Sequence, residues 1–415
     1  MPPATDKPPT EHRWLRRFTY LVILATFSLI AIGGHVTSTD VGLAVPDGFT
    51  TFGHNTLLAP LEVWWYDFGT RWEHGHRLKG NVVGMMSITM AVWLLLVYRD
   101  TSRDRQGKSA MGRLYAMIYR LRITLEGPRP YLRLSGVVML VAVSSQGIMG
   151  ALRVSEISLT LAFVHGICGQ LILCGWIIIA AALSKSWLER LGAIKRGKRD
   201  HAKAPLRWAV RVLLVLLLIQ LTLGSAVRHF KADKAPPDMM IYGQLLPPMS
   251  QESLDRIVVE YHSEEYGLTA EETGFVNRTP QGEIVVKLSD VDLQISHRIG
   301  ALVVSITAVL IILVTLRRAT QYPIVCAPAL LVLTLLATQV AFGVITVVSK
   351  TDPIMATLHQ ATGAILFASS TWLAVRIHLA EYAPAAVIAD VDAEDVGTAP
   401  APVPRPQEQR TPVTA

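Results

Sequence analysis

Long apolar runs separated by polar segments dominate the chain, and eight of these runs are long enough to cross a lipid bilayer. A membrane-spanning helix needs about 20 residues. Because backbone polar groups inside lipid must bond within the chain, we expect every run to form an α-helix. The predicted spans are 18–36, 76–98, 132–152, 160–183, 208–228, 296–316, 324–348 and 354–378.

Composition agrees with this pattern. Of the 415 residues, 51% are hydrophobic and only 17% are charged, whereas roughly 25% of the residues of soluble domains are charged. The first span follows the basic residues Arg13, Arg16 and Arg17, but its apolar stretch is longer than the core of a secretory signal peptide. We therefore expect an integral, multi-pass membrane protein that keeps its first helix.

Charge asymmetry predicts the orientation in the membrane. Segments 99–130 and 184–206 carry eight and seven Lys or Arg residues, while segment 229–293 carries five basic and twelve acidic residues. The positive-inside rule then places both termini in the cytoplasm, in a bacterial cell membrane or its equivalent. Anchoring at the inner leaflet explains the net charge of +7. The lipid bilayer is thus an expected partner, and nucleic acid is not.

Several motifs occur twice along the chain. Residues 146–150 begin with Gln and end with Gly, as do residues 339–343, and a histidine follows each motif at a similar distance. Gly33 and Gly224 lie at matching places near the ends of the first and fifth spans. Two repeats of four helices would share one orientation, as in other parallel repeats. The predicted fold is an all-α membrane protein whose eight transmembrane helices form two duplicated four-helix bundles.

This pattern predicts a division of the chain into bundles, a linker and tails. These are a cytoplasmic tail at 1–17, an N-terminal bundle at 18–190, a basic cytoplasmic linker at 191–206, a C-terminal bundle at 207–380 and a disordered cytoplasmic tail at 381–415. Pro, Ala, Thr and acidic residues in the tails are typical of disorder. The C-terminal bundle includes the long outer loop 229–293, in which Asn277 begins a glycosylation sequon, a weak pattern by itself.

Four histidines occupy matching places in the two predicted bundles. His76 and His297 each begin the second span of a half, and His165 and His359 lie near the start of the fourth. A lone histidine in a span is usually a packed polar residue, but a polar side chain repeated inside a membrane indicates a partner in the bundle interior. Imidazoles on facing helices can bind both faces of one haem iron. The repeat therefore predicts two haem sites near the outer side of the membrane.

The halves differ three residues before the leading histidine, where Glu73 stands in the first half and Gln294 in the second. Three residues are nearly one helical turn, so both side chains share a face with their histidine. A carboxylate can exchange protons, while an amide only forms hydrogen bonds. We therefore assign substrate chemistry to the N-terminal half, with Glu73 as its catalytic carboxylate. The alternative is that Glu73 is an acid at a helix start, stabilised by the helix dipole.

Arg77 and Arg298 directly follow the leading histidines. Either they bind haem propionates, because a guanidinium pairs with a carboxylate through two hydrogen bonds, or they only anchor the helices at the membrane interface. Histidines without a matched partner are interpreted as surface or loop residues; they are His35, His54, His74, His229 and His262. The cysteines lie within predicted spans and are interpreted as packing residues; they are Cys168, Cys174 and Cys326.

The eight-helix plan, the Glu-x-x-His-Arg motif at 73–77 and His165, His297 and His359 together resemble the haem A synthase family. The resemblance covers residues 18–380. It implies oxidation of a methyl group of haem O to a formyl group, which gives haem A for cytochrome oxidase. It also implies a resident haem b that passes electrons in one half and the substrate haem in the other. We therefore expect His297 and His359 to bind the haem b iron, and His76 and His165 to bind the iron of the substrate haem.

The resemblance implies a haem O synthase as the partner that supplies substrate, while the electron donor stays unknown and a homo-oligomer stays open. Residues 42–47 lack the cysteine pair that some family members carry there, which excludes a thiol-dependent role for this loop. Two other functions compete. A di-haem membrane cytochrome would only transfer electrons between quinol and a partner, and Glu73 in one half alone argues against it. A transporter site would lie nearer the bilayer midplane than these histidines do.

Overall fold

The computed structural model describes residues 12–97, 130–196, 204–232, 236, 238–273, 277–279, 281–318 and 323–382. Most of both predicted tails and most of segment 99–130 lie outside these ranges. Within them the chain is almost entirely helical, apart from one short antiparallel hairpin of β1 (Thr50–Thr51) and β2 (His54–Asn55).

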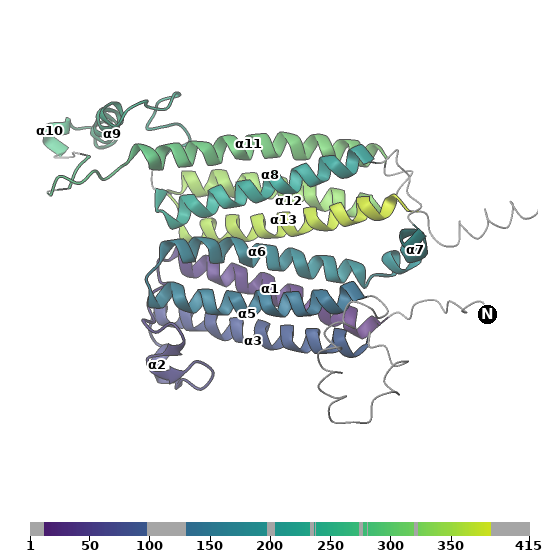
Figure 1. Ribbon diagram of the computed structural model, residues 1–415. Helices are drawn as coiled ribbons and strands as arrows, with labels where there is room; N and C mark the ends of the chain where they lie inside the picture. The colour runs from purple at the N-terminus through teal and green to yellow at the C-terminus, as the bar shows by residue number, and fades with distance from the viewer. Residues whose placement is uncertain are drawn as a thin grey trace, which may run out of the picture.

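In the described ranges, eight long helices run roughly side by side along one direction (Figure 1). They are α1 (Arg13–Ser38), α3 (Phe68–Val97), α5 (Pro130–Ser155), α6 (Leu159–Ala182), α8 (Ala204–His229), α11 (Leu288–Arg317), α12 (Cys326–Val348) and α13 (Pro353–Ala380). All eight are long and apolar enough to cross a membrane. The prediction of an all-α membrane protein with eight spans is confirmed.

Two helices begin earlier than their apolar runs do. Helix α3 begins at Phe68 and α11 at Leu288, so His76 and His297 lie about two turns inside their helices and not at the starts. The carboxylate of Asp67 explains the early start of α3, because it accepts the backbone N–H of Thr70 at 2.7 Å and caps the first turn. Hydropathy predicts the part of a helix that lies in lipid, while the capping residue determines where the helix begins.

Helix contacts divide the long helices into two groups. In the first half, α1, α3, α5 and α6 contact one another in a closed ring, and in the second half α8, α11, α12 and α13 do the same. Contacts of α13 with α1 and α6, and of α6 with α8, join the halves. This arrangement fits the predicted pair of four-helix bundles, and the duplication itself stays a prediction.

Apolar packing follows the same division. One cluster of buried side chains joins α1, α3, α5 and α6, and includes Trp176 and Met90. A larger cluster fills the second half and extends into α6 through Leu173 and Cys174. The sulfur of Cys174 accepts a hydrogen bond from the Thr371 hydroxyl at 3.3 Å across the two halves. Cys174 is therefore a packing residue, as expected.

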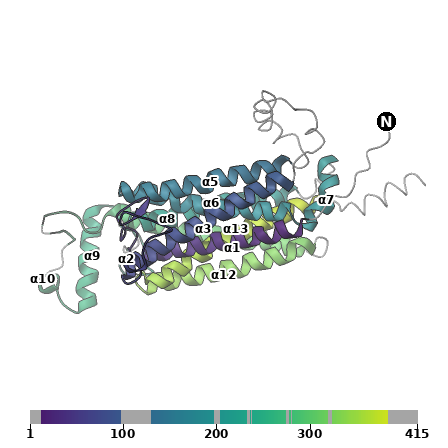
Figure 2. The same ribbon diagram turned by 90° about the horizontal axis from the view of Figure 1, so that it is seen from below.

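Short helices lie at the two ends of the long ones. Helices α2 (Leu61–Trp64), α9 (Gln251–Tyr266) and α10 (Ala270–Thr273) lie at one end, called the loop end here, and α7 (Lys185–Arg196) lies at the other (Figures 1 and 2). Segment 229–293, for which the sequence predicts no particular element, thus contains two helices. Helix α7 crosses the predicted boundary between the N-terminal bundle and the linker.

Candidate functional site

The four predicted ligand histidines lie near the loop end, each within about 15 Å of the start of its helix. Each imidazole packs against a glycine of the preceding long helix, and a side chain at that glycine would approach the ring's Cε1 atom to between 2.8 and 3.1 Å. The pairs are Gly33 with His76, Gly150 with His165, Gly224 with His297 and Gly343 with His359. Glycine therefore makes room for an imidazole at four matching places.

In the C-terminal half the two imidazoles face each other. The ring centroids of His297 and His359 are 6.5 Å apart and the rings are perpendicular, at 89°. A metal bound by one nitrogen of each ring at about 2 Å would hold the centroids roughly 6 Å apart. The described residues contain no cluster of three or more His, Cys, Asp or Glu side chains able to hold a bare metal ion. Two axial nitrogens at this spacing fit an iron whose other ligands come from a porphyrin.

Glutamines hold both rings of this pair. The Nδ1 atom of His359 lies 3.1 Å from the backbone oxygen of Gln339, and the side chain of Gln339 lies 3.3 Å from Nε2. The side-chain nitrogen of Gln220 lies 2.9 Å from the Nδ1 atom of His297 and 2.9 Å from the backbone oxygen of the same residue. Partners on Nδ1 fix the orientation of an imidazole and leave Nε2 as the nitrogen for a metal, and in His359 the Gln339 amide lies at that Nε2 atom.

The N-terminal pair lacks this support. The Nδ1 atoms of His76 and His165 are buried and make no hydrogen bond within the described part of the chain. The ring of His76 approaches only the backbone of Leu29, which lies four residues before Gly33 just as Gln220 lies four before Gly224. Gln146, the counterpart of Gln339, donates its side-chain N–H to the backbone oxygen of His165 at 2.9 Å, and only its backbone reaches the ring.

Glu73 is buried, with 3% of its surface exposed, and both of its oxygens are bonded. One accepts the backbone N–H of Val45 and the other pairs with Arg77, each at 2.8 Å. Because α3 begins at Phe68, Glu73 lies in the second turn, which disagrees with the helix-start alternative. Gln294 is likewise buried, at 6% exposure, so both halves bury a side chain at this position and only one of these side chains carries a charge.

Arg77 binds the loop that follows α1. Its guanidinium donates to the backbone oxygens of Thr50 at 2.6 Å and Val45 at 3.1 Å, besides its pair with Glu73. The described contacts thus tie this arginine to the loop, and propionate binding by it stays a prediction.

Arg298 does the same in the second half. It donates to the backbone oxygens of Met240 at 3.1 Å, Met239 at 3.2 Å and Pro236 at 3.4 Å. In both halves the arginine after the leading histidine therefore fastens the loop that follows the first helix.

The same two loops share a turn. Asp47 accepts the backbone N–H of Gly53 at 2.6 Å, and Asp238 accepts that of Gly243 at 2.7 Å. Both glycines have positive φ, +80° and +75°, a conformation that glycine adopts at no steric cost. The matching turns add a structural likeness between the halves to the repeated motifs of the sequence.

The interpretation of His74 as a surface or loop residue is wrong. It lies in α3 with 1% exposure, its Nδ1 atom is 2.9 Å from the Thr51 hydroxyl, and its ring stacks on Trp64 at 4.3 Å. The physical reason is the early start of α3, which places His74 against the hairpin and α2. His35 also lies in a helix, where its ring packs on Trp72 at 4.3 Å.

Sequence reasoning missed Arg153 and Gln220. Arg153 lies near the end of α5 and donates to the backbone oxygen of Gly42 at 2.7 Å. A charged residue at the edge of one span and an amide inside another were available signals, because polar residues in membrane spans usually have a function.

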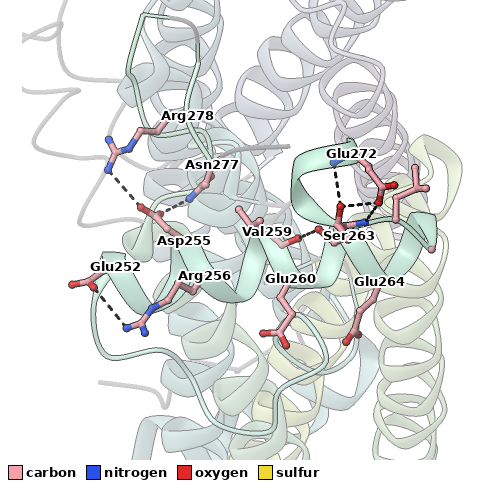
Figure 3. A pocket seen from close by; sticks show the side chains of 13 residues that line it. Glu252, Asp255, Arg256, Val259, Glu260, Ser263, Glu264, Glu272, Asn277 and Arg278 are labelled. Atoms are coloured by element: carbon pink, nitrogen blue, oxygen red, sulfur yellow. Dashed lines mark hydrogen bonds and ion pairs between the residues drawn. The ribbon is translucent and has the colours of Figure 1, made fainter. Parts of the chain in front are cut away.

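A solvent-open pocket lies along α9 (Figure 3), away from the histidines. Its polar side chains bond mainly to one another: Asp255 accepts from Asn277 at 2.7 Å and pairs with Arg278 at 3.5 Å. Asn277 is 3% exposed and also donates to the backbone oxygen of Val286. Its side chain is therefore enclosed in the folded loop, which disfavours the sequon as a modification site.

Known proteins resemble this chain over most of its long helices. A family model described as a cytochrome oxidase assembly protein, COX15-CtaA, matches residues 16–371. Heme A synthase of Methylorubrum extorquens strain PA1 is 26% identical over 280 residues, covering 60% of this chain and 62% of that relative. Heme A synthase of Methylorubrum populi is 26% identical over 276 residues, with the same two shares.

The matched region spans less than two thirds of the length of these curated relatives. The family match is wider and includes all four histidines, their four glycines and Glu73. On that match, the chain belongs to the COX15-CtaA family of cytochrome oxidase assembly proteins.

Proposed function

We propose that this protein is a haem A synthase, which oxidises a methyl group of haem O to a formyl group and so produces haem A for cytochrome oxidase. The observation that carries the proposal is the difference between two otherwise matching histidine pairs. Side-chain amides of Gln220 and Gln339 approach the rings of one pair, while the rings of the other pair interact only with backbone groups, and a buried carboxylate, Glu73, precedes His76 by three residues. Family membership and relatives named heme A synthase support it.

In this proposal His297 and His359 hold a resident haem b. When bound, that haem supplies one-electron transfer. The protein's own contribution is to fix both imidazoles through Gln220 and the backbone of Gln339, and to leave ring-sized space at Gly224 and Gly343. A fully satisfied ligand pair suits a group that stays bound through many reaction cycles.

His76 and His165 take the substrate haem, which must enter and leave. Rings that lack a side-chain amide partner are held less firmly, so one of their bonds to iron can open during turnover. Glu73 is the buried carboxylate that we assign to proton exchange during oxidation of the methyl group. Its ion pair with Arg77 at 2.8 Å holds the carboxylate in place.

The protein is an integral, multi-pass membrane protein, as its eight apolar helices and its family indicate. We further propose that both termini face the cytoplasm, which places the histidine end of the bundle on the outer side. A haem O synthase is the proposed source of substrate, delivered within the bilayer.

Pigment analysis tests the proposal directly. The full-length protein would be produced in cells that make haem O, and the haems of the membranes would be extracted and separated. A haem A synthase yields haem A, with haem B retained in the purified protein. A di-haem cytochrome yields haem B and unconverted haem O but no haem A, which would reject the synthase.

A further inference from the structure

Arg153 stands beside the proposed substrate site. It follows Gly150, the glycine that packs against His165, by three residues on α5. Its guanidinium is close enough to His76, His165 and Glu73 to interact with them electrostatically. Its Nη2 atom donates to the backbone oxygen of Gly42 at 2.7 Å, which ties it to the loop after α1.

The charge of Arg153 has no carboxylate partner within the described ranges. Glu73 is the nearby carboxylate, but one of its oxygens accepts the N–H of Val45 and the other pairs with Arg77. The N-terminal site therefore holds one guanidinium more than this ion pair neutralises. Binding of an anion to a half-buried guanidinium is favourable, because the new ion pair offsets the free-energy cost of removing the guanidinium from water.

The second half has no such cation at the matching place. Three residues after Gly343 stands Thr346, whose hydroxyl donates to the backbone oxygen of Phe342 at 2.7 Å. Arg77 and Arg298, by contrast, occur in both halves and bind equivalent loops. Arg153 is thus a cation at a position where the haem b half carries a neutral residue, while that half has its own arginine, Arg228, near His359.

We propose that Arg153 binds a propionate carboxylate of the substrate haem, and that this carboxylate replaces the Gly42 carbonyl on the guanidinium. The inference rests on the proposed function and adds a recognition residue to it. A guanidinium binds a carboxylate through two parallel hydrogen bonds that are stronger than a bond to a neutral carbonyl. Three side chains hold the loop 42–50: Arg153, Glu73 and Arg77. The exchange of partners on Arg153 releases the first of these contacts and leaves the other two.

Binding of two probes tests the proposal without relying on turnover. The purified full-length protein, with its resident haem in place, would be titrated with haem B and with haem B dimethyl ester, in which both carboxylates are blocked. The wild-type protein should bind the free acid roughly 10- to 100-fold more tightly than the ester, the range expected of a hydrogen bond to a charged group. Arg153→Gln should bind the two probes nearly equally, and Arg153→Lys should lie between.

Thr346→Val is the matched control, because it changes the equivalent place in the other half and should leave the preference intact. The spectrum of the resident haem reports whether each variant folds. A full preference for the free acid in a folded Arg153→Gln protein would overturn the role of Arg153 and leave the proposed function standing. Failure of the wild-type protein to bind either probe would overturn the substrate site itself, and the role of Arg153 with it.

Discussion

The two histidine pairs are built on the same scaffold and surrounded differently. In each half a glycine faces each ring, an arginine fastens the loop after the first helix, and an Asp–Gly turn shapes that loop. What differs is the layer around the rings. Gln220 and Gln339 form hydrogen bonds with the rings of His297 and His359, whereas the ring of His76 interacts with only the backbone of Leu29. Under the proposed function, the shared scaffold would set where iron binds, and the polar groups around the rings would set how permanently it binds.

Loss of a ligand imidazole should have the largest effect. His297→Ala and His359→Ala should each remove nearly all resident haem b, because a bis-histidine iron loses an axial bond and its orientation. The measurement is haem B per protein together with the reduced absorption spectrum. His76→Ala and His165→Ala, the matched changes in the other half, should keep the haem b spectrum. Haem b lost from the N-terminal variants and kept in the C-terminal ones would reverse the assignment of the halves.

Removing the charge of Glu73 should come next. Glu73→Gln should lower haem A production by about 100-fold or more, the usual range for a lost general base, while haem b stays bound. An amide oxygen can still accept the N–H of Val45, so the loop keeps that bond and loses the ion pair with Arg77. The ratio of haem A to haem O in membranes measures the effect. Gln294→Glu is the control, and wild-type haem A in Glu73→Gln cells would show that the carboxylate is dispensable.

Exchange of the residues around the rings sharpens the comparison further. Gln220→Leu gives the second half the residue found at the matching place in the first, and should weaken haem b retention by roughly 10- to 100-fold, as loss of a partner of a ligand does. Leu29→Gln should do the opposite and slow release of haem from the N-terminal site. Both rates of haem release are measured as the transfer of haem to excess apomyoglobin. Equal rates in wild-type and Gln220→Leu protein would contradict the idea that this amide fixes the ligand.

The smallest expected effect is the loss of stability at low pH of the loop that contains Asp47. Hydrogen bonds from Gly53 and Thr50 hold the pKa of Asp47 below its ordinary value. Ionised Asp47 therefore stabilises the loop above the ordinary pKa of about 4, and this stabilisation disappears as the pH falls through the lower pKa of the folded loop.

Amide exchange of the 47–53 segment, corrected for intrinsic rates, should rise a few-fold between about pH 6 and pH 3. Asp47→Asn should exchange faster at pH 6 and lose most of this dependence. The same pH profile in wild-type and variant protein would show that another group controls the loop.

Hydropathy was sufficient for the eight spans, because each apolar run is a local signal. The repeated spacing selected four histidines that the structure packs against matching glycines, and their role as iron ligands stays a prediction. Both signals were insufficient for the position of His74, which depends on a capping carboxylate at Asp67 and a hairpin that packs from outside the apolar run. Arg153 was missed for a related reason. Its meaning comes from Gly42, which lies more than one hundred residues away, and no local pattern predicts such a contact.

Helix α13 carries His359 and also forms much of the wall between the halves, against α1 and α6. The side chain of Gln360, next to His359, lies directly against Gly34, whose neighbour Gly33 faces His76. The route from one imidazole to the other therefore passes through two adjacent glycines and a single side-chain contact. Either half produced as a separate chain would expose the α13 contact surface with α1 and α6 to lipid. We therefore expect both sites to require the full-length chain.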